Sequence, residues 1–363
     1  MTSLPSHSFA RVHIVGTGLL GTSAGLALGE RGLHVTLEDV SPSSLSLAED
    51  YGAGLRRSAE DPDPDLVVVA TPPDVVADEV VRALEEFPSA IVMDVASVKA
   101  GIVRDVGRSS SHSDRFVPTH PMAGRERGGA VSGRSDLFTA RPWVMCGENS
   151  PALDRVRALI VSLGALPLQM AAEEHDDAVA LMSHIPQLVA SLMGARLQGA
   201  SESALGLAGG GVRDVTRIAL SDPALWVQIL AANSEPIAEH LRALRDELND
   251  VLQALQDVHT AGSRKTLAEA LSAGVSGVSR LPGKHGASTA FASLIVVIDD
   301  SPGELARLLT QLGDWGVNLE DLRLEHSPGA QVGFADLTLT KDVVADVESQ
   351  LRDAGWRIAG ERS

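Results

Sequence analysis

Short apolar segments alternate with helical patterns through residues 1–170. Each apolar segment is bounded by Gly, Pro, Asp or Ser and lacks the polar alternation of a half-exposed strand. Such segments are typical of strands buried on both faces of a parallel sheet. The patterns between them, among them Asp74–Glu86 and Leu153–Leu163, have helical spacing and predict crossover helices. We expect an α/β domain with strands at Val12–Val15, Val35–Leu37, Leu66–Ala70, Ile91–Met93, Phe116–Val117 and Trp143–Cys146.

The next stretch, residues 171–257, carries long helical patterns with no strand pattern between them. Pro186 lies inside the first pattern and predicts a kink, because proline lacks an N–H and its ring clashes with the preceding turn. We expect an all-helical domain that is too thin to bury its apolar faces without a partner surface. Its expected helices are Glu173–Gln198, Pro223–Ala232 and Glu235–Gln256.

The C-terminal part combines a linker with a small α/β domain. Residues 258–287 are rich in glycine and predict a linker with one short helix around Lys265–Leu271. Residues 288–363 predict the order βαββαβ, which is typical of a ferredoxin-like domain. Its expected elements are Ala292–Ile298, Glu304–Trp315, Leu319–Glu325, Gly333–Thr340, Val343–Asp353 and Trp356–Ala359.

Composition and charge narrow the class of protein. Hydrophobic residues make up 44% and charged residues 21% of the 363 residues, as expected of a packed globular chain with two or three domains. The formal net charge of −18 disfavours binding to nucleic acid or to anionic membranes. No apolar run approaches the ~20 residues that cross a bilayer, and the N-terminal segment lacks the features of a signal peptide. Cys146 is the only cysteine, which fits a reducing compartment, so we expect a cytoplasmic protein.

A glycine-rich turn follows the first expected strand. Gly16-Thr-Gly18-Leu-Leu-Gly21 opens an expected helix, Leu19–Gly29. In this context Gly16 permits a tight turn, Gly18 lets the backbone approach a pyrophosphate, and Gly21 lets helix and strand pack closely. The pattern predicts a dinucleotide site of the Rossmann type, with a tight turn that binds no ligand as the alternative. The expected contacts are Gly16, Gly18, Leu19, Leu20 and Gly21.

The end of the second strand predicts the cofactor. It carries Glu38 and Asp39, and a carboxylate there accepts hydrogen bonds from a ribose diol and repels a 2′-phosphate. The next arginine is Arg56, so NAD is favoured over NADP. Strand alternation lets only one of the two carboxylates face the ligand. We expect Asp39, at the strand end, with Glu38 as the alternative.

Polar residues follow the next strands at the sheet edge where ligands bind. Thr71 ends the third expected strand, Ser97 follows the fourth, and His120 follows the fifth. Pro121 holds His120 in an extended conformation. A histidine held by the Ser97 hydroxyl and facing a cofactor can act as a general base toward a substrate hydroxyl. For a single loop histidine the alternative is a hydrogen bond that stabilises a turn.

Two segments of the helical domain add candidate residues. Ser183-His184-Ile-Pro186 places an imidazole at the expected kink. Gly209-Gly-Gly-Val-Arg213-Asp214-Val-Thr-Arg217 is a glycine-rich loop that runs into a helix, so Arg213 and Arg217 share a face. Guanidinium groups bind carboxylates bidentately, which suits a carboxylate substrate, with Asp214 orienting one arginine. A surface ion-pair cluster is the alternative.

Together these motifs resemble the prephenate/arogenate dehydrogenase family of tyrosine biosynthesis. The resemblance implies that NAD+ takes a hydride from C4 of a cyclohexadienol, the ring carboxylate leaves as CO2 and the ring becomes aromatic. It also implies a homodimer through the helical domain, and no metal. The motifs occur in the family's order over most of the chain: Gly16–Gly21, Ser97 in D-x-x-S-x-K, His120 in H-P-M-A-G, Glu126, His184 in S-H-I-P, G-G-x-R-D-x-T-R ending at Arg217, Trp226 and Asn233.

The resemblance assigns a role to each candidate residue. His120 would take the proton of the C4 hydroxyl, and Ser97 would hold His120 and contact the nicotinamide. Arg217 would anchor a substrate carboxylate. The other expected substrate-binding residues are His184, Arg213, Asp214, Glu126 and Trp226.

Two departures from the family pattern touch substrate selection. Arg213 stands where members often have Lys, and Gln187 stands where many have a second His. Prephenate is the expected substrate, and arogenate stays the alternative.

The C-terminal motifs resemble an ACT domain, an amino-acid-sensing module. They are Asp300-Ser-Pro302-Gly303 and Gly316-Val-Asn318-Leu319. The resemblance implies a ligand site at Asp300, Gly303, Asn318 and Leu319, with tyrosine as the expected effector. A domain that only dimerises, or one that binds phenylalanine or another amino acid, is the alternative.

Two other classes of protein remain open. A β-hydroxyacid dehydrogenase or an imine reductase also joins a dinucleotide domain to helices, but does not predict H-P-M-A-G at the sheet edge. A non-catalytic regulator that responds to NAD and an amino acid would not need Ser97, His120 and Arg217 to converge.

Overall fold

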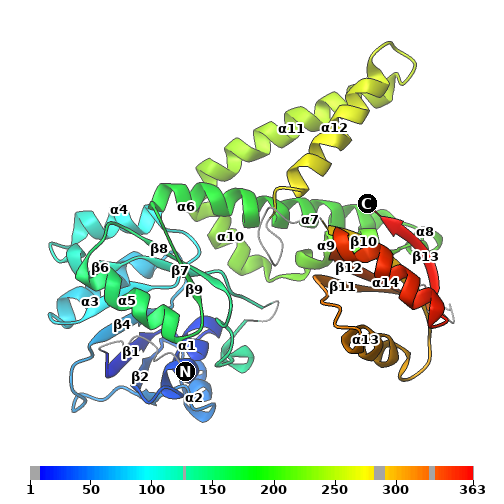
Figure 1. Cartoon of the computed structure of the whole chain (residues 1–363). Helices are drawn as coiled ribbons and strands as arrows, with labels where there is room; N and C mark the ends of the chain where they lie inside the picture. Colours follow the sequence, from blue (N-terminus) through cyan, green and yellow to red (C-terminus); the bar gives the residue numbers. More distant parts are fainter. Residues whose placement is uncertain (1–8, 126–127, 282–290, 327–331, 363) are drawn as a thin grey trace. The chain divides into compact units, whose positions relative to one another are not determined.

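The computed structural model describes the chain except residues 1–8, 126–127, 282–290, 327–331 and 363 (Figure 1). It divides into two compact units. The first comprises residues 1–200 and 215–244, and the second comprises residues 201–214 and 245–363. This division differs from the domain boundaries expected from the sequence, which stay predictions.

The first unit contains a parallel sheet in the order β3-β2-β1-β4-β5-β6. The chain crosses from one side of β1 to the other between β3 and β4, which creates the switch point where doubly wound sheets bind ligands. The predicted α/β fold is confirmed, and the sheet contains five expected strands and one short strand, β3, that was not expected. The bounds are β1 Arg11–Val15, β2 His34–Glu38, β3 Leu55–Arg56, β4 Leu66–Val69, β5 Ile91–Asp94 and β6 Phe116–Val117.

Helices cover both faces of this sheet because its strands are apolar on both faces. In β4, Leu66 and Val68 pack into one core cluster, and Val67 and Val69 pack into another. The first cluster includes side chains of α1, α2 and α5, and the second includes those of α3 and α4. The helices are α1 Leu19–Gly29, α2 Pro42–Asp50, α3 Val76–Glu86, α4 Ala100–Ser109 and α5 Pro151–Ser162.

The expected strand Trp143–Cys146 is not part of this sheet, which corrects the prediction. It lies in β8 (Pro142–Cys146), the middle strand of a second sheet, between β7 (Thr119–Pro121, antiparallel) and β9 (Leu166–Met170, parallel). Pro118 separates β6 from β7 and has no N–H with which to continue pairing. The carbonyl of Pro118 instead accepts the N–H of Cys146 at 2.8 Å. This change of sheet places His120 in the centre of β7.

The long helical pattern after β9 forms one continuous run (Figure 1). It consists of α6 (Ala172–Val179), a π-helical turn (Ala180–His184) and α7 (Ile185–Arg196). The π turn lies where Pro186 predicts a kink, because the missing N–H loosens the preceding turn. The following helices are α8 Glu202–Leu205, α9 Gly210–Thr216, α10 Pro223–Ala232 and α11 Ser234–Gln256, with 3₁₀ turns at Leu197–Gly199 and Arg217–Leu220.

Within the expected linker, the described residues 258–281 contain a helix longer than predicted. The short helix predicted at Lys265–Leu271 is α12, Ser263–Val278, with 16 residues. Gly274 and Gly277 suggested a break, but each costs only about 1 kcal/mol in a helix, and the residues around them are good helix formers. The glycine content of this segment therefore led to an expectation of more loop than the structure has.

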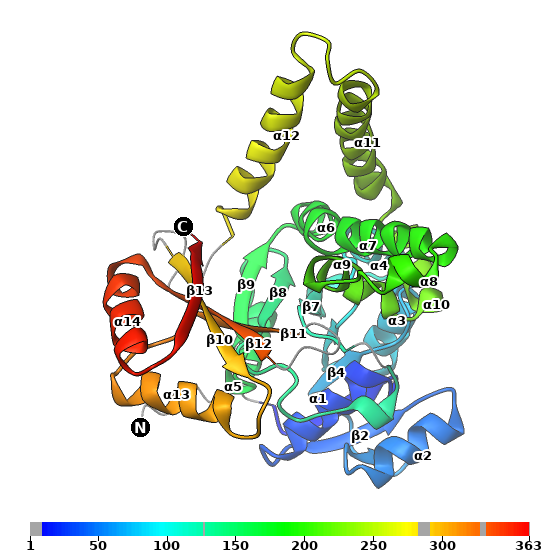
Figure 2. The same cartoon turned by 90° about the vertical axis from the view of Figure 1, so that its right-hand side faces the viewer.

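The C-terminal domain has the predicted βαββαβ order. Its antiparallel sheet runs β11-β12-β10-β13, and α13 and α14 pack on one face of it (Figure 2). Alternate residues of β10 and β12, such as Leu294, Val296 and Leu337, are buried against these helices. The bounds are β10 Phe291–Asp299, α13 Glu304–Asp314, β11 Asp321–His326, β12 Val332–Thr340, α14 Lys341–Asp353 and β13 Arg357–Arg362.

Candidate active site

The glycine-rich turn has the shape of a dinucleotide cradle. Gly16 has φ of +96°, and a Cβ there would lie 2.6 Å from the carbonyl oxygen of Ala70. A Cβ on Gly21 would lie 1.9 Å from the carbonyl oxygen of Gly16, so helix and turn require glycine at both positions. A Cβ on Gly18 would meet no atom within 4 Å, so this side of the turn is open. A pyrophosphate fits against that open backbone.

The groups around the turn also suit an anionic, hydroxyl-bearing ligand. Helix α1 has no acidic residue in its first turn and no side-chain cap, so its first N–H groups, on Leu19 and Leu20, are available to an anion. The Thr71 hydroxyl is buried and has no hydrogen-bond partner among the described residues. It follows Ala70, against which the turn packs. The residues present therefore fit a bound dinucleotide.

The two carboxylates at the end of β2 have different surroundings. Asp39 accepts hydrogen bonds from the Thr17 N–H at 2.6 Å and the Thr17 hydroxyl at 2.8 Å, so it lies directly beside the glycine turn. Glu38 instead meets His13 at 3.2 Å and accepts from Arg82 at 3.0 Å. The hydrogen bond with His13 and the charge of Arg82 lower the pKa of Glu38. This arrangement favours Asp39 as the ribose partner.

The hydrogen-bond partner of His120 is a histidine and not the expected serine. His120 Nδ1 lies 2.9 Å from His175 Nε2, and the two rings meet edge to face. The described structure records no hydrogen bond between His120 and Ser97, which is half-buried in the loop after β5. The role of Ser97 in holding His120 and the catalytic roles of both residues stay predictions. His175 comes from α6, 55 residues further along the chain.

His175 is in turn fixed by Asp176. The distance from His175 Nδ1 to Asp176 Oδ1 is 2.8 Å, and His175 is fully buried. Asp176 also accepts the backbone N–H groups of Lys99 and Ala100, each at 2.8 Å. These bonds tie α6 to the start of α4. The contact could not be predicted from the sequence, because acidic residues in a helix are normally solvated.

A buried ion pair joins the two sheets beneath this network. The Lys99 ammonium donates to the Asp94 carboxylate and, at 2.8 Å, to the carbonyl of Thr119. Both charged side chains are fully buried. Burial raises the pKa of Asp94, and the charge of Lys99 opposes that rise. Asp94 also accepts the Thr119 N–H at 3.0 Å, which fixes the residue before His120.

His120 is held in its neutral form. Burial lowers the pKa of His120 well below the usual value for histidine, and the electrostatic effects of His175, Lys99 and His184 act in the same direction. At neutral pH its ring therefore carries a free lone pair. A neutral imidazole can accept a proton from a substrate hydroxyl, which is the chemistry expected of a general base.

A third histidine lies next to this group. His184 is buried in the π turn, and its Nδ1 lies 3.1 Å from Nδ2 of Asn233. The Asn233 amide also donates to the carbonyl of Asp176 at 2.7 Å. Burial lowers the pKa of His184 to about 4. The ring of Trp226 meets the His184 ring edge to face at 6.0 Å, so two of the expected substrate residues are neighbours.

The expected arginine cluster is divided between the two units. Arg213 and Asp214 lie in α9 within the second unit, whereas Arg217 begins the 3₁₀ turn Arg217–Leu220 in the first. That turn packs on α7, where a Cβ on Gly194 would lie 3.8 Å from the Cβ of Ala219. All three charged side chains are exposed. Glu126 lies outside the described residues, so the assignment of these four residues to a substrate site stays a prediction.

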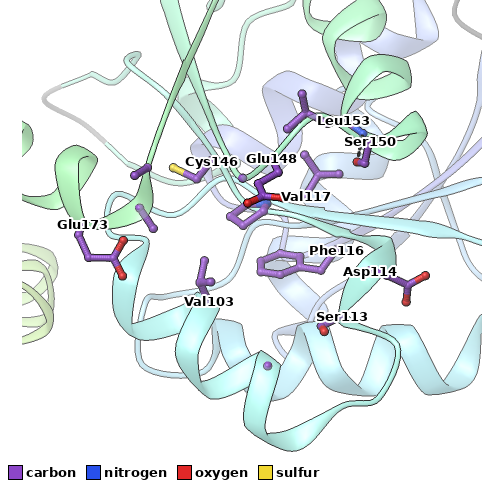
Figure 3. A pocket seen from close by; sticks show the side chains of 15 residues that line it. Val103, Ser113, Asp114, Phe116, Val117, Cys146, Glu148, Ser150, Leu153 and Glu173 are labelled. Atoms are coloured by element: carbon purple, nitrogen blue, oxygen red, sulfur yellow. Dashed lines mark hydrogen bonds between the residues drawn. The ribbon is translucent and has the colours of Figure 1, made fainter.

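His120 is not among the lining residues of either of two cavities in the part of the chain that the structure describes. One, of about 570 Å³, is lined by apolar side chains such as Phe116 and Cys146 and by acidic groups such as Glu148 (Figure 3). Burial raises the pKa of the Cys146 thiol to about 12, so it stays protonated.

The other cavity, of about 420 Å³, lies in the C-terminal domain and is lined by Asn318 among others. Asp300, Gly303 and Leu319 are not among its lining residues, and Leu319 packs against the domain core. The proposed effector residues therefore do not all share this cavity.

The doubly wound sheet and the glycine turn at its switch point are those of a dinucleotide-binding protein. Residues 24–166 match the family model of the nucleotide-binding domain of prephenate dehydrogenase, and residues 171–272 match that of its dimerization domain. The chain is 34% identical to a probable prephenate dehydrogenase, NovF, of Streptomyces niveus, over 94% of this chain and 98% of that protein. The chain belongs to the prephenate dehydrogenase family and is an NAD-dependent dehydrogenase.

Two further comparisons agree with this assignment. A prephenate dehydrogenase of Bacillus subtilis is 26% identical over 86% of this chain and 87% of its own length. The crystal structure of prephenate dehydrogenase from Aquifex aeolicus, in complex with hydroxyphenyl propionate and NAD+, is 26% identical. It superposes with a TM-score of 0.65 over 75% of this chain and 99% of that chain. Residues 288–363 lie beyond both family models, so the ACT resemblance stays a prediction.

Proposed function

We propose that this chain catalyses the NAD-dependent oxidative decarboxylation of prephenate to 4-hydroxyphenylpyruvate. The observation that carries the proposal is the neutral imidazole of His120 at the edge of the nucleotide-binding sheet, in a chain that belongs to the prephenate dehydrogenase family. When bound, NAD+ supplies the hydride acceptor. The protein's own residues then bind the substrate, remove the proton of its C4 hydroxyl and later return it.

The proton begins and ends on the same oxygen. As C4 of prephenate loses its hydride, the C4 hydroxyl gives its proton to Nε2 of His120 and a carbonyl forms. The bond to the ring carboxylate then breaks, CO2 leaves, and its electron pair makes the ring aromatic and the oxygen a phenolate. His120 returns the proton to that oxygen. The products are therefore 4-hydroxyphenylpyruvate, CO2 and NADH, without net proton release.

The other expected residues would bind and orient the substrate. Asn233 donates to Nδ1 of His184, which leaves an N–H on Nε2 of that ring as a donor to substrate. Arg217 would bind a substrate carboxylate through its guanidinium, as Arg side chains do bidentately. Ser97 would contact the nicotinamide end of the cofactor. The roles of Arg213, Asp214, Glu126 and Trp226 in substrate binding stay predictions from the sequence motifs.

Arogenate is the second candidate substrate. An arogenate dehydrogenase of Synechocystis shares the fold with a TM-score of 0.60 at 23% identity. Gln187, where many family members have a second histidine, is buried and donates to Ser191 at 3.4 Å. Its amide is neutral, so it would not repel the ammonium group that arogenate carries where prephenate has a keto oxygen.

We propose that the chain is a homodimer through residues 171–257. Leu192 and Val227 of the first unit are 64% and 66% exposed, and Leu248 of the second unit is 63% exposed. These are apolar side chains that a partner would cover. The run Ala172–Gly199 is by length and composition apolar enough to cross a membrane. It contains the buried, hydrogen-bonded His175 and Asp176, so we assign its exposed apolar side chains to the dimer contact.

The test compares substrates directly. The purified chain is incubated with prephenate or arogenate and with NAD+ or NADP+, and NADH or NADPH formation is followed by absorbance. The proposal requires the highest kcat/KM with prephenate and NAD+. Preference for arogenate would establish the second candidate, and no reduction with either substrate would contradict both.

A further inference from the structure

His175 uses both of its ring nitrogens within the site. Nε2 faces His120 at 2.9 Å and Nδ1 faces Asp176 at 2.8 Å, and the side chain is fully buried. The ring therefore joins the candidate base to a carboxylate. The rest of its environment is closed to solvent, so these two contacts define what it can do.

The hydrogen bonds run in one direction. Asp176 accepts N–H groups from Lys99 and Ala100, so it is an acceptor toward His175 as well. His175 must then carry its proton on Nδ1 and present a lone pair on Nε2. That lone pair requires an N–H on Nδ1 of His120, which leaves the lone pair of His120 on Nε2.

We propose that His175 is a proton-relay and positioning residue that acts through His120, an inference that rests on the proposed function. As the substrate O–H bond breaks, an N–H bond forms on Nε2 of His120. The Nδ1–H bond of His120 breaks in turn, and an N–H bond forms on Nε2 of His175. The positive charge then resides on His175 next to the Asp176 carboxylate. The same steps in reverse return the proton to the phenolate.

The charges around the pair favour this transfer. His120 is faced by Lys99 and His184 as well as by His175, and burial together with these groups lowers its pKa. A positive charge on His120 is therefore costly. On His175 the charge is in direct contact with a carboxylate that has no ammonium partner of its own, because Lys99 donates its ammonium to Asp94. The proton taken from the substrate therefore leaves its positive charge on His175, beside Asp176, and not on His120.

Two substitutions separate positioning from relay. In His175→Gln, the amide oxygen can still accept the Nδ1–H of His120 but the side chain cannot take a proton. In His175→Leu, both functions are lost. We expect kcat to fall by about 10–10² in the first and by about 10²–10⁴ in the second, the range that general-base catalysis covers. KM should change little in His175→Gln, because the ring is not expected to touch substrate.

The matched control is His240→Gln. His240 also pairs with an aspartate of α6, Asp177 at 3.1 Å, but at the surface. This variant should keep the kcat of the unmodified chain. A second readout is the dependence of kcat on the fraction of D2O, which should be curved for the unmodified chain, because two protons move, and linear for His175→Gln. A kcat for His175→Gln equal to that of the unmodified chain, or the same linear dependence in both, would overturn the relay.

The relay can also be tested without turnover. In protein labelled with ¹⁵N at histidine, NMR should show Nδ1–H and unprotonated Nε2 for both His120 and His175. In His175→Gln the His120 tautomer should persist. A proton on Nε2 of His120 would overturn the relay whether or not the enzyme is active. If the unmodified chain reduces NAD+ with neither substrate but shows these tautomers, the proposed function fails and the relay geometry stands.

Discussion

At the scale of single residues, the chemistry depends on an imidazole that remains uncharged. Burial and the electrostatic effects of three neighbouring side chains lower the pKa of His120, so the base is available at neutral pH and is lost only as the pH falls through that lowered value. The sequence could predict His120, because its motif follows a strand at the ligand-binding edge. It could not predict His175, whose role depends on α6 packing beside α4.

His120→Asn should lower kcat by ~10²–10⁴, because asparagine occupies similar space but cannot accept the proton. The Kd for NAD+ should be unchanged, since the glycine turn and Asp39 are untouched. Steady-state kinetics and a fluorescence titration with NAD+ measure the two quantities. His112→Asn, a substitution at an exposed histidine, is the control. A kcat near that of the control would remove His120 from the chemistry.

Asp39→Ser should weaken NAD+ binding and narrow the preference over NADP+. The carboxylate both accepts from the ribose diol and repels a 2′-phosphate, and serine does neither to the same degree. The ratio of kcat/KM for the two cofactors measures the change. Glu38→Gln is the matched control, because Glu38 pairs with His13 and Arg82. If that control shifts the ratio and Asp39→Ser does not, the roles are reversed.

At the scale of elements, the strands could be predicted because they are buried on both faces. The sheet to which a strand belongs depends on tertiary contacts and could not be predicted. Apolar runs such as Leu66–Val69 are buried on both faces, so their composition alone indicates a strand. The run Trp143–Cys146 has the same composition but belongs to the second sheet, because Pro118 interrupts the chain between β6 and β7. The length of helix α12 was underestimated, because glycine lowers helix propensity without preventing a helix.

The buried ion pair between Lys99 and Asp94, which links the two sheets, gives a prediction at this scale. Lys99→Met should destabilise the fold by ~3–5 kcal/mol, because it leaves the Asp94 carboxylate buried without its partner. Urea denaturation followed by tryptophan fluorescence measures the loss. Lys265→Met removes an exposed ion pair with Glu269 and should leave stability nearly unchanged. Equal stability of both variants would mean that Asp94 is not held as a charged group.

At the scale of the whole molecule, the C-terminal domain lies beyond both family models and has its own core. We expect tyrosine to bind it and inhibit the enzyme, which requires two sites linked by a shared change of state. In the full chain, Asn318→Ala should weaken tyrosine inhibition and keep the uninhibited kcat. Asn249→Ala, at an exposed position of α11, should behave like the unmodified chain.

Equal inhibition of the Asn318→Ala variant and the unmodified chain would instead indicate that tyrosine competes at the catalytic site. The domain would then serve another purpose, such as dimerisation. Inhibition constants measured at several prephenate concentrations distinguish these cases, because a competitive inhibitor raises only the apparent KM.

The central claim is that one site couples hydride loss to decarboxylation. The most direct measurement uses prephenate labelled with ¹³C in its ring carboxylate, and follows labelled CO2 and NADH together during turnover by the full chain. The account predicts that the two are released in equal amounts and that His120→Asn slows both to the same extent. NADH without labelled CO2, or labelled CO2 without NADH, would contradict it.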